Sequence, residues 1–288
     1  MKNAKRSHNF FKAYSEFVNP KVFLLFEQIL TMRVLFVNAH PDDTEFTCAA
    51  TCLQMVQLGW DVHQLLMTTD EYGTKRDDFK GKRIRAIRKN EMETAAKEYG
   101  VDENGKTLIT LHWFGEIDGY LPFNRDVYSR LRQKVMELDP DLVIGPDSFF
   151  SMDLHPDHKH TGWLIYFVVK SLPEQSRPRL WLYHSFATNH YVPFTDFSIQ
   201  VEAWSKHRSQ TSPFANKVLY PLRKIFYTFR RLRTGPAFAE GFREVTFAPG
   251  ENKIEKLQHR ILYHFVADKM SSLPRERYLP TPEELGLR

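Results

Sequence analysis

The sequence is poor in cysteine, with only Cys48 and Cys52 among 288 residues. Two thiols four residues apart cannot form the disulfide framework of a small secreted protein. We therefore interpret them as small buried side chains and expect a protein of a reducing compartment, the cytoplasm. The length suits one large domain that buries a core of its own.

The sequence also lacks an apolar run near its start that could cross a bilayer. The apolar stretch 22–30 is too short and contains Glu27 and Gln28, and no small-residue cleavage site follows it. We do not interpret it as a membrane span or a signal peptide. Residues 1–31 are basic and then apolar, and we interpret them as an appended, partly helical extension before a single domain at 32–288.

A glycine-rich phosphate loop and an extreme net charge are absent too. Without such a loop after the first expected strand, bound nucleotide is discounted. The formal charge is +5, and the basic, aromatic stretch 220–233 is most simply the solvated face of a helix. Nucleic acid is not expected as a partner, because no nucleic-acid motif accompanies this stretch. Peripheral contact with an anionic membrane or glycolipid head is the alternative.

Strand-like and helix-like segments alternate through the first two-thirds of the chain. Strands are expected at 33–39, 61–69, 106–114, 141–146 and 179–186, and helices at 45–58, 84–100, 124–140 and 158–172. A later helix is expected at 197–210, a strand at 242–248 and a terminal helix at 251–266. The alternation predicts an α/β fold, a Rossmann-like, mostly parallel sheet with helices on both faces. Ligands bind such sheets beyond the carboxyl ends of the strands.

Two similar clusters follow the first and the fourth expected strands. They are NAHPDDTEF at 38–46 and DLHPDHKH at 153–160, so both project from the same sheet edge. A catalytic zinc takes three His or carboxylate ligands and keeps a position for water. His40, Asp43 and His158 supply such a set. Each cluster alone is more typical of a capped loop, but the pair at one edge favours a metal site.

The remaining polar residues of these clusters suit acid–base chemistry. Asp42 stands beside the expected ligands and could take a proton from the attacking water. His155 could stabilise a tetrahedral oxyanion, and Asp157 could orient His155.

Together, these segments resemble the LmbE-like / PIG-L superfamily of zinc-dependent N-deacetylases. AHPDDTEF and HPDH are similar to the two motifs of that family, RKNEMETAAKEYGV at 88–101 to its Arg-x-x-Glu helix, and GEIDGYL at 115–121 to the turn before the next helix. DFSIQVEAWSKHRSQ at 196–210 and AEGFREV at 239–245 are also similar to family segments. The resemblance covers residues 33–248 and leaves out the N-terminal extension.

The resemblance implies a role for each matching position. It implies the zinc ligands His40, Asp43 and His158, the general base Asp42, the oxyanion-stabilising His155 paired with Asp157, and the substrate contacts Arg88 and Asp118. Arg88 also has a plain structural alternative, an i,i+3 pair with Glu91 on one helix face. Thr44 departs from the family, since many members carry Glu there, and this departure bears on substrate fit.

The activity implied by the resemblance is hydrolysis of the N-acetyl amide of an N-acetylglucosamine-type sugar or glycoconjugate. The cofactor is Zn²⁺, although the same ligands accept other divalent ions. Two alternatives stay open: an amidase that removes a larger acyl group, and a non-catalytic sugar- or lipid-binding protein on the same fold. The complete ligand set argues against the second. We expect specificity to depend on loops 70–83, 146–154 and 186–196, and no feature of the sequence predicts an oligomeric state.

Overall fold

The computed structural model describes most of the chain between residues 32 and 252. The described residues are 32–74, 76–151, 153, 155–211, 221, 224–225, 227, 238–252, 282–283 and 285–287. The N-terminal extension, most of the stretch 220–233 and nearly all of the expected terminal helix lie outside the described residues.

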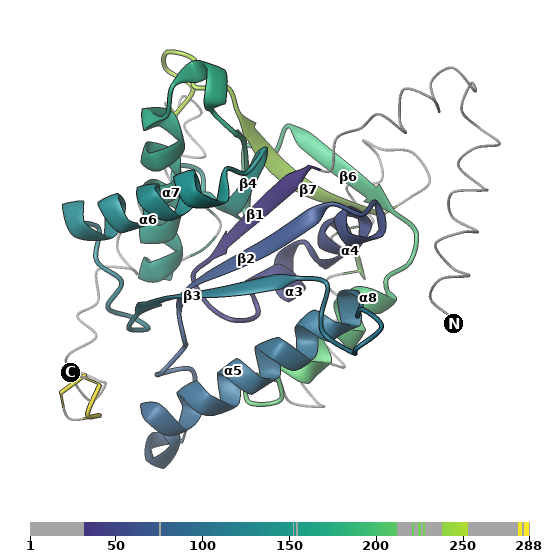
Figure 1. Cartoon of the computed structure of the whole chain (residues 1–288), viewed down its shortest axis with the longest axis vertical. Helices are drawn as coiled ribbons and strands as arrows, with labels where there is room; N and C mark the ends of the chain where they lie inside the picture. The colour runs from purple at the N-terminus through teal and green to yellow at the C-terminus, as the bar shows by residue number, and fades with distance from the viewer. Residues whose placement is uncertain are drawn as a thin grey trace.

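A seven-stranded sheet runs through the described part of the molecule in the order β3-β2-β1-β4-β5-β7-β6 (Figure 1). The strands are β1 (Arg33–Asn38), β2 (Asp61–Thr68), β3 (Thr110–Glu116), β4 (Leu142–Pro146), β5 (Arg179–Tyr183), β6 (His190–Phe194) and β7 (Phe238–Val245). The first five in chain order pair in parallel, whereas β7 pairs antiparallel with β5 and with β6. The predicted mostly parallel α/β fold is confirmed.

Helices cover both faces of this sheet (Figure 1). They are α3 (Asp43–Thr47), α4 (Ala49–Gln57), α5 (Lys82–Ala96), α6 (Arg125–Leu138), α7 (Pro156–Ser171) and α8 (Ser198–Glu202). Side chains alternate along β1, so Val34 and Phe36 pack in the core on the α4 and α8 side, and Leu35 and Val37 pack in the core under α6 and α7. Burial on both faces explains why β1 is an unbroken apolar run.

Helix α7, which carries the second cluster, is fixed closely against β4. Pro156 begins the helix, and the His155 Nδ1 caps it by accepting from the Asp157 amide at 3.3 Å. Gly162 faces the loop after β4, where a Cβ would overlap with the Ser148 Oγ and lie 2.5 Å from the Pro146 carbonyl oxygen. The close approach places the start of α7 beside the end of β1.

Two expected elements differ in the structure. The helix expected at 45–58 is broken at Cys48, whose φ is −148°. The Thr47 Oγ1 donates to the Asp43 carbonyl at 2.6 Å, a bond that competes with helix continuation. Strand β6 also occupies 190–194, where a loop was expected, because it pairs with the distant β7.

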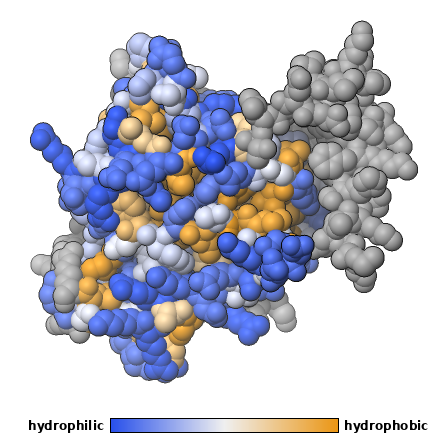
Figure 2. Space-filling model, in the orientation of Figure 1, coloured by the Kyte–Doolittle hydropathy of each residue, from blue (hydrophilic) through white to orange (hydrophobic). Residues whose placement is uncertain are grey.

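The face of the molecule seen in Figure 2 is largely polar. Figure 2 shows hydrophilic residues over the outer surfaces of α5 and α6, with hydrophobic residues visible mainly between these helices, over the sheet. Among the described residues, no helix is long and apolar enough to cross a membrane.

Candidate metal centre and active site

A polar cavity of about 450 Å³ lies where the carboxyl ends of β1, β2 and β4 meet. Its wall includes both sequence clusters, together with residues from four other segments. The lining residues are His40, Asp42, Asp43, Phe46, Asp70, Tyr72, Gly73, Asp118, Asp153, His155, His158, His184, Trp204 and Gln210. The two clusters therefore meet, as their positions after neighbouring parallel strands predicted.

Three donor atoms of the predicted metal ligands face one another in this cavity. The His40 Nδ1 lies 2.9 Å from the His158 Nε2, which lies 3.2 Å from the Asp43 Oδ1. In a tetrahedral zinc site with bonds of about 2.0–2.1 Å, neighbouring ligand atoms lie about 3.3 Å apart. All three residues are buried. The spacing and the donor types fit one divalent cation.

The opposite nitrogen of each imidazole is held by a carboxylate. The His40 Nε2 lies 3.0 Å from the Asp118 Oδ1, and the His158 Nδ1 donates to the Asp153 carboxylate. Because a carboxylate only accepts, each of these outer nitrogens carries a ring proton. The inner nitrogens are then the ones that can bind a cation, in exchange for any proton they carry in the metal-free protein.

Asp43 is fixed by the backbone of its own loop. Its Oδ2 accepts from the amides of Ala39 at 2.8 Å and His40 at 3.1 Å, leaving the Oδ1 toward His158. Burial alone would raise the pKa of Asp43, but the two imidazoles hold that pKa well below its usual range. The carboxylate is ionised and ready to bind a cation.

Asp42 lines the cavity beside these ligands and is held by Arg88. The Arg88 Nη2 donates to the Asp42 Oδ2 at 2.7 Å and to the Pro41 carbonyl oxygen, and its Nε lies 2.6 Å from the Asp70 Oδ2. Burial raises the pKa of Asp42, and the Arg88 charge opposes that rise. A carboxylate with a raised pKa in this place suits a general base.

Arg88 itself is completely buried behind Asp42 and is not among the cavity-lining residues. Its Nη1 lies 3.4 Å from the Glu91 Oε2, so the i,i+3 pair is present. The same Nη1 lies 3.2 Å from the Nδ1 of His207, a buried residue that the sequence did not assign to the site. Substrate contact by Arg88 stays a prediction, while the geometry shows a residue that positions Asp42.

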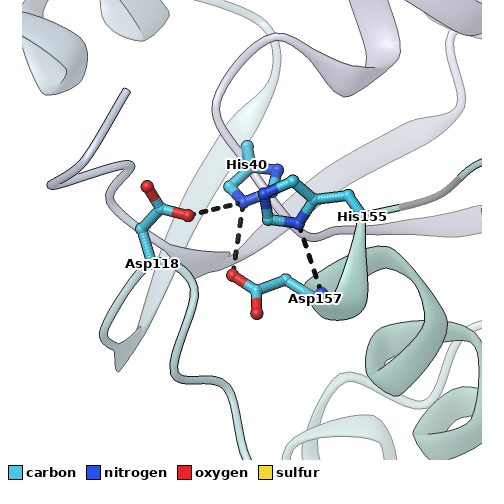
Figure 3. A group of neighbouring side chains, drawn as sticks. All are labelled: His40, Asp118, His155 and Asp157. Carbon is cyan, nitrogen blue, oxygen red and sulfur yellow. Dashed lines mark hydrogen bonds and ion pairs between the residues drawn. The ribbon is translucent and has the colours of Figure 1, made fainter. Parts of the chain in front are cut away.

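Asp118, His155 and Asp157 surround the outer side of the His40 ring (Figure 3). The contact between His155 and Asp157 runs through the Asp157 backbone amide. The Asp157 carboxylate accepts from the Gly119 amide at 2.5 Å and lies 3.4 Å from the His40 Nε2. Orientation of His155 by the Asp157 carboxylate stays a prediction, while the start of α7 brings the Asp157 amide to the His155 ring.

Asp153 and His184 were not predicted as site residues. The Asp153 Oδ2 contacts the His158 Nδ1 and lies 3.3 Å from the His184 Nδ1, so one carboxylate holds two rings that line the cavity. A signal for Asp153 was present, since a carboxylate five residues before a ligating histidine lies in the same cluster. His184 follows β5 and carried no such signal.

Backbone strain gathers around the cavity. Asp42, Asp70 and His184 have φ values of 148°, 57° and 55°, a region that non-glycine residues rarely adopt. Such conformations cost of order 1–3 kcal/mol each and are typical of functional sites.

Of the expected specificity loops, 70–83 and 146–154 contribute lining residues, whereas none of the described lining residues comes from 186–196. Thr44 is buried against Asn38, whose amide donates to its Oγ1 at 2.8 Å.

Several known proteins of similar sequence are named as deacetylases. A family model described as PIG-L, GlcNAc-PI de-N-acetylase, matches residues 35–168. The diacetylchitobiose deacetylase of Thermococcus kodakarensis is 26% identical over 259 residues, 84% of this chain and 93% of that protein. The probable N-acetyl-alpha-D-glucosaminyl L-malate deacetylase 2 of Bacillus anthracis is 30% identical over 207 residues, 65% of this chain and 83% of that protein.

A solved structure of the N,N'-diacetylchitobiose deacetylase from Pyrococcus horikoshii superimposes with a TM-score of 0.67 at 26% identity, covering 79% of this chain and 93% of that one. The sheet, the facing imidazoles and the adjacent carboxylates define a metal-dependent hydrolase. The carboxyl-edge position of its centre is the one that a parallel sheet favours. The chain belongs to the PIG-L family and is a deacetylase of that type.

Proposed function

We propose that this protein uses Zn²⁺ to hydrolyse the N-acetyl amide of an N-acetylglucosamine-type sugar or glycoconjugate, releasing acetate and an amino sugar. The observation that carries the proposal is the approach of His40, Asp43 and His158 to one point, with Asp42 beside them. The named substrates of the relatives, diacetylchitobiose and N-acetylglucosaminyl malate, support the substrate class.

Each side chain around the proposed metal position has a separate role in amide hydrolysis. A bound Zn²⁺ would polarise the acetyl carbonyl and lower the pKa of a water molecule. Asp42, held by Arg88, takes the proton of the attacking water. His155 donates a hydrogen bond to the oxyanion as the carbonyl carbon becomes tetrahedral. The proton then passes to the leaving amine, and the C–N bond breaks.

The cavity is large enough for a sugar unit and offers aromatic surfaces for it. Its volume of about 450 Å³ lies within the range of small-molecule sites. Phe46 and Trp204 pack with ring centroids 5.1 Å apart on one wall, and Tyr72 stands on another. We assign the aromatic walls to the apolar faces of the sugar, and Asp118 to its hydroxyl groups.

The proposal is tested by measuring acetate release from free N-acetylglucosamine, diacetylchitobiose, N-acetylglucosaminyl malate, and inositol and lipid conjugates of N-acetylglucosamine. We expect metal-dependent release from at least one of them, and release slowed about 10²–10⁴-fold in the Asp42→Ala variant. Release of a longer acid from longer-acyl analogues, without acetate release, would favour the alternative amidase. Sugar binding with no hydrolysis in the metal-loaded protein would reject the enzymatic proposal.

Contact with an anionic membrane remains a separate proposal. It is supported by the composition of 220–233, a stretch that lies mostly outside the described residues. Sedimentation with liposomes tests it, and the proposal predicts stronger binding to anionic than to neutral vesicles. Equal binding to both would end it.

A further inference from the structure

A second group of metal-binding side chains lies on the outer side of the His40 ring. The His40 Nε2 is 3.0 Å from the Asp118 Oδ1 and 3.4 Å from the Asp157 Oδ2. His155 completes the group, and one donor atom from each of the four residues lies within 4.8 Å of the others. Figure 3 shows Asp118 and Asp157 both directed at the same His40 nitrogen. This nitrogen is not the one that faces His158.

We propose that His40, Asp118, His155 and Asp157 form a second, inhibitory cation site, in which the His40 ring bridges two Zn²⁺ ions. The donor set of two imidazoles and two carboxylates is one that zinc favours. The distances of 3.0 and 3.4 Å bracket the separation of about 3.3 Å between neighbouring ligand atoms in a tetrahedral zinc site.

The two carboxylates are already held in place for this role. The Asp118 Oδ2 accepts from the Tyr72 amide at 3.0 Å, which turns the Oδ1 toward His40. The Asp157 Oδ2 accepts from the Gly119 amide at 2.5 Å. Asp118 and Asp157 are 3% and 0% exposed. Two buried carboxylates at fixed positions concentrate negative charge where a cation would enter.

The cation replaces the proton that His40 shares with these carboxylates. Without excess zinc, the His40 N–H donates to Asp118, and the ring is oriented for the first ion. When a second ion binds, its bond to the His40 Nε2 forms as the N–H bond breaks, and the proton leaves to the solvent. The ion's bond to the His155 Nδ1 forms as that atom gives up the hydrogen bond from the Asp157 amide. No oxidant or reductant takes part.

The second ion would inhibit deacetylation because two of its ligands have roles in the proposed reaction. This consequence rests on the proposed function. His155 is the residue assigned to the oxyanion, and Asp118 is assigned to the sugar. An ion held by both removes them from the substrate, whereas the first set, His40, Asp43 and His158, stays complete. The protein should be most active with one ion per chain and lose activity as a second binds.

The test begins with metal-free, full-length protein titrated with Zn²⁺ in equilibrium dialysis, with metal analysis of each fraction. We expect two equivalents of Zn²⁺ per chain, with the second bound at least about a hundredfold more weakly than the first. The rate of acetate release should fall about tenfold as the second equivalent binds. The His155→Ala variant should retain the first equivalent and lose at least about tenfold in affinity for the second. The matched control His190→Ala, on β6, should bind both like the wild type.

A spectroscopic measurement tests the bridge independently of activity. Two Cu²⁺ ions joined by one imidazole ring couple magnetically, so the electron paramagnetic resonance signal of the first equivalent should shrink when the second is added. Retention of the first equivalent also shows that the His155→Ala variant is folded. A single equivalent at saturating zinc, a second one that His155→Ala leaves unchanged, or a signal that simply doubles would each overturn the proposal. Two coupled equivalents in a protein that deacetylates no sugar would instead reject the proposed function alone.

Discussion

The His40 Nδ1 lies 2.9 Å from the His158 Nε2, although 118 residues separate the two in the sequence. The two histidines come close because β1 and β4 are neighbouring parallel strands, so their carboxyl ends lie at the same edge of the sheet. The two nitrogens face each other because carboxylates hold the opposite side of each ring. Asp42 stands beside this pair in the cavity wall.

Replacing Asp42 should separate chemistry from metal binding. Asp42→Ala removes the proton acceptor and leaves the three facing donors in place, so we expect turnover to fall about 10²–10⁴-fold with metal content unchanged. Steady-state kinetics with metal analysis measure both. The matched control Asp126→Ala, an exposed residue of α6, should retain wild-type turnover. Full activity of Asp42→Ala would show that another group takes the proton.

Replacing Arg88 should destabilise the protein strongly. The Arg88→Met variant keeps the volume but leaves Asp42, Asp70 and Glu91 without their buried cation, which costs about 3–5 kcal/mol in free energy of unfolding. Urea denaturation measures this loss. Arg83→Met, on the exposed side of the same helix, should change the stability by about 1 kcal/mol at most.

A second Arg88 variant, Arg88→Lys, distinguishes positioning of Asp42 from contact with the substrate. If Arg88 only positions Asp42, a folded Arg88→Lys protein should lose kcat with little change in KM, because lysine lacks the planar fork. A raised KM at unchanged kcat and stability would support the substrate contact that the family resemblance implies.

Glu240 should stabilise the protein through a contact between β7 and the start of α4. Its carboxylate, on β7, accepts from the Ala50 and Thr51 amides at 3.0 and 2.7 Å, at the start of α4. Glu240→Ala leaves these buried amides without that acceptor, and we expect a loss of about 1–3 kcal/mol in chemical denaturation. Glu244→Ala removes a more exposed ion pair with Arg179 and should cost less than about 1 kcal/mol. Equal losses in the two variants would contradict the capping role.

The stability of the metal-free protein should fall as the pH rises above neutrality. Burial lowers the pKa of His158, but Asp43 and Asp153 outweigh it and raise the pKa from 6.5 to about 10. A pKa raised by folding stabilises the protein fully below about pH 6.5, and this contribution is lost as the pH rises to about 10. Thermal unfolding between pH 6 and pH 10 should therefore show a steeper fall of Tm in the metal-free wild type than in His158→Gln. Parallel curves would contradict the assignment.

The sequence predicted the parts of the site that depend on local pattern and strand order. The unbroken apolar run of β1 and the Pro-Asp clusters after β1 and β4 were enough to place His40, Asp43 and His158 together. Their tautomers depend on Asp118 and Asp153, which reach the rings only in three dimensions. Topology brings together residues from different strands, but it does not show which atoms meet.

The remaining differences also arise from contacts distant in sequence. Thr47 gives a local reason for the break after α3, but the start of α4 also depends on Glu240, which accepts from the Ala50 amide 190 residues away and left no local signal. The local sequence pattern predicts that Arg88 lies on the surface of an amphipathic helix. Its complete burial is explained by the carboxylates of Asp42 and Asp70, which pair with its guanidinium group. Strand β6 depends on pairing with β7 rather than on its own composition, which includes Pro193.

The most direct test of the central claim is the metal content of the purified protein, compared with His158→Gln and with the matched control His160→Gln on the same helix. We expect about one divalent ion per chain in the wild type and in His160→Gln after excess metal is removed, and less than about a tenth of that in His158→Gln. Equal metal content in all three proteins, or none in any, would contradict a cation site shared by the two loops.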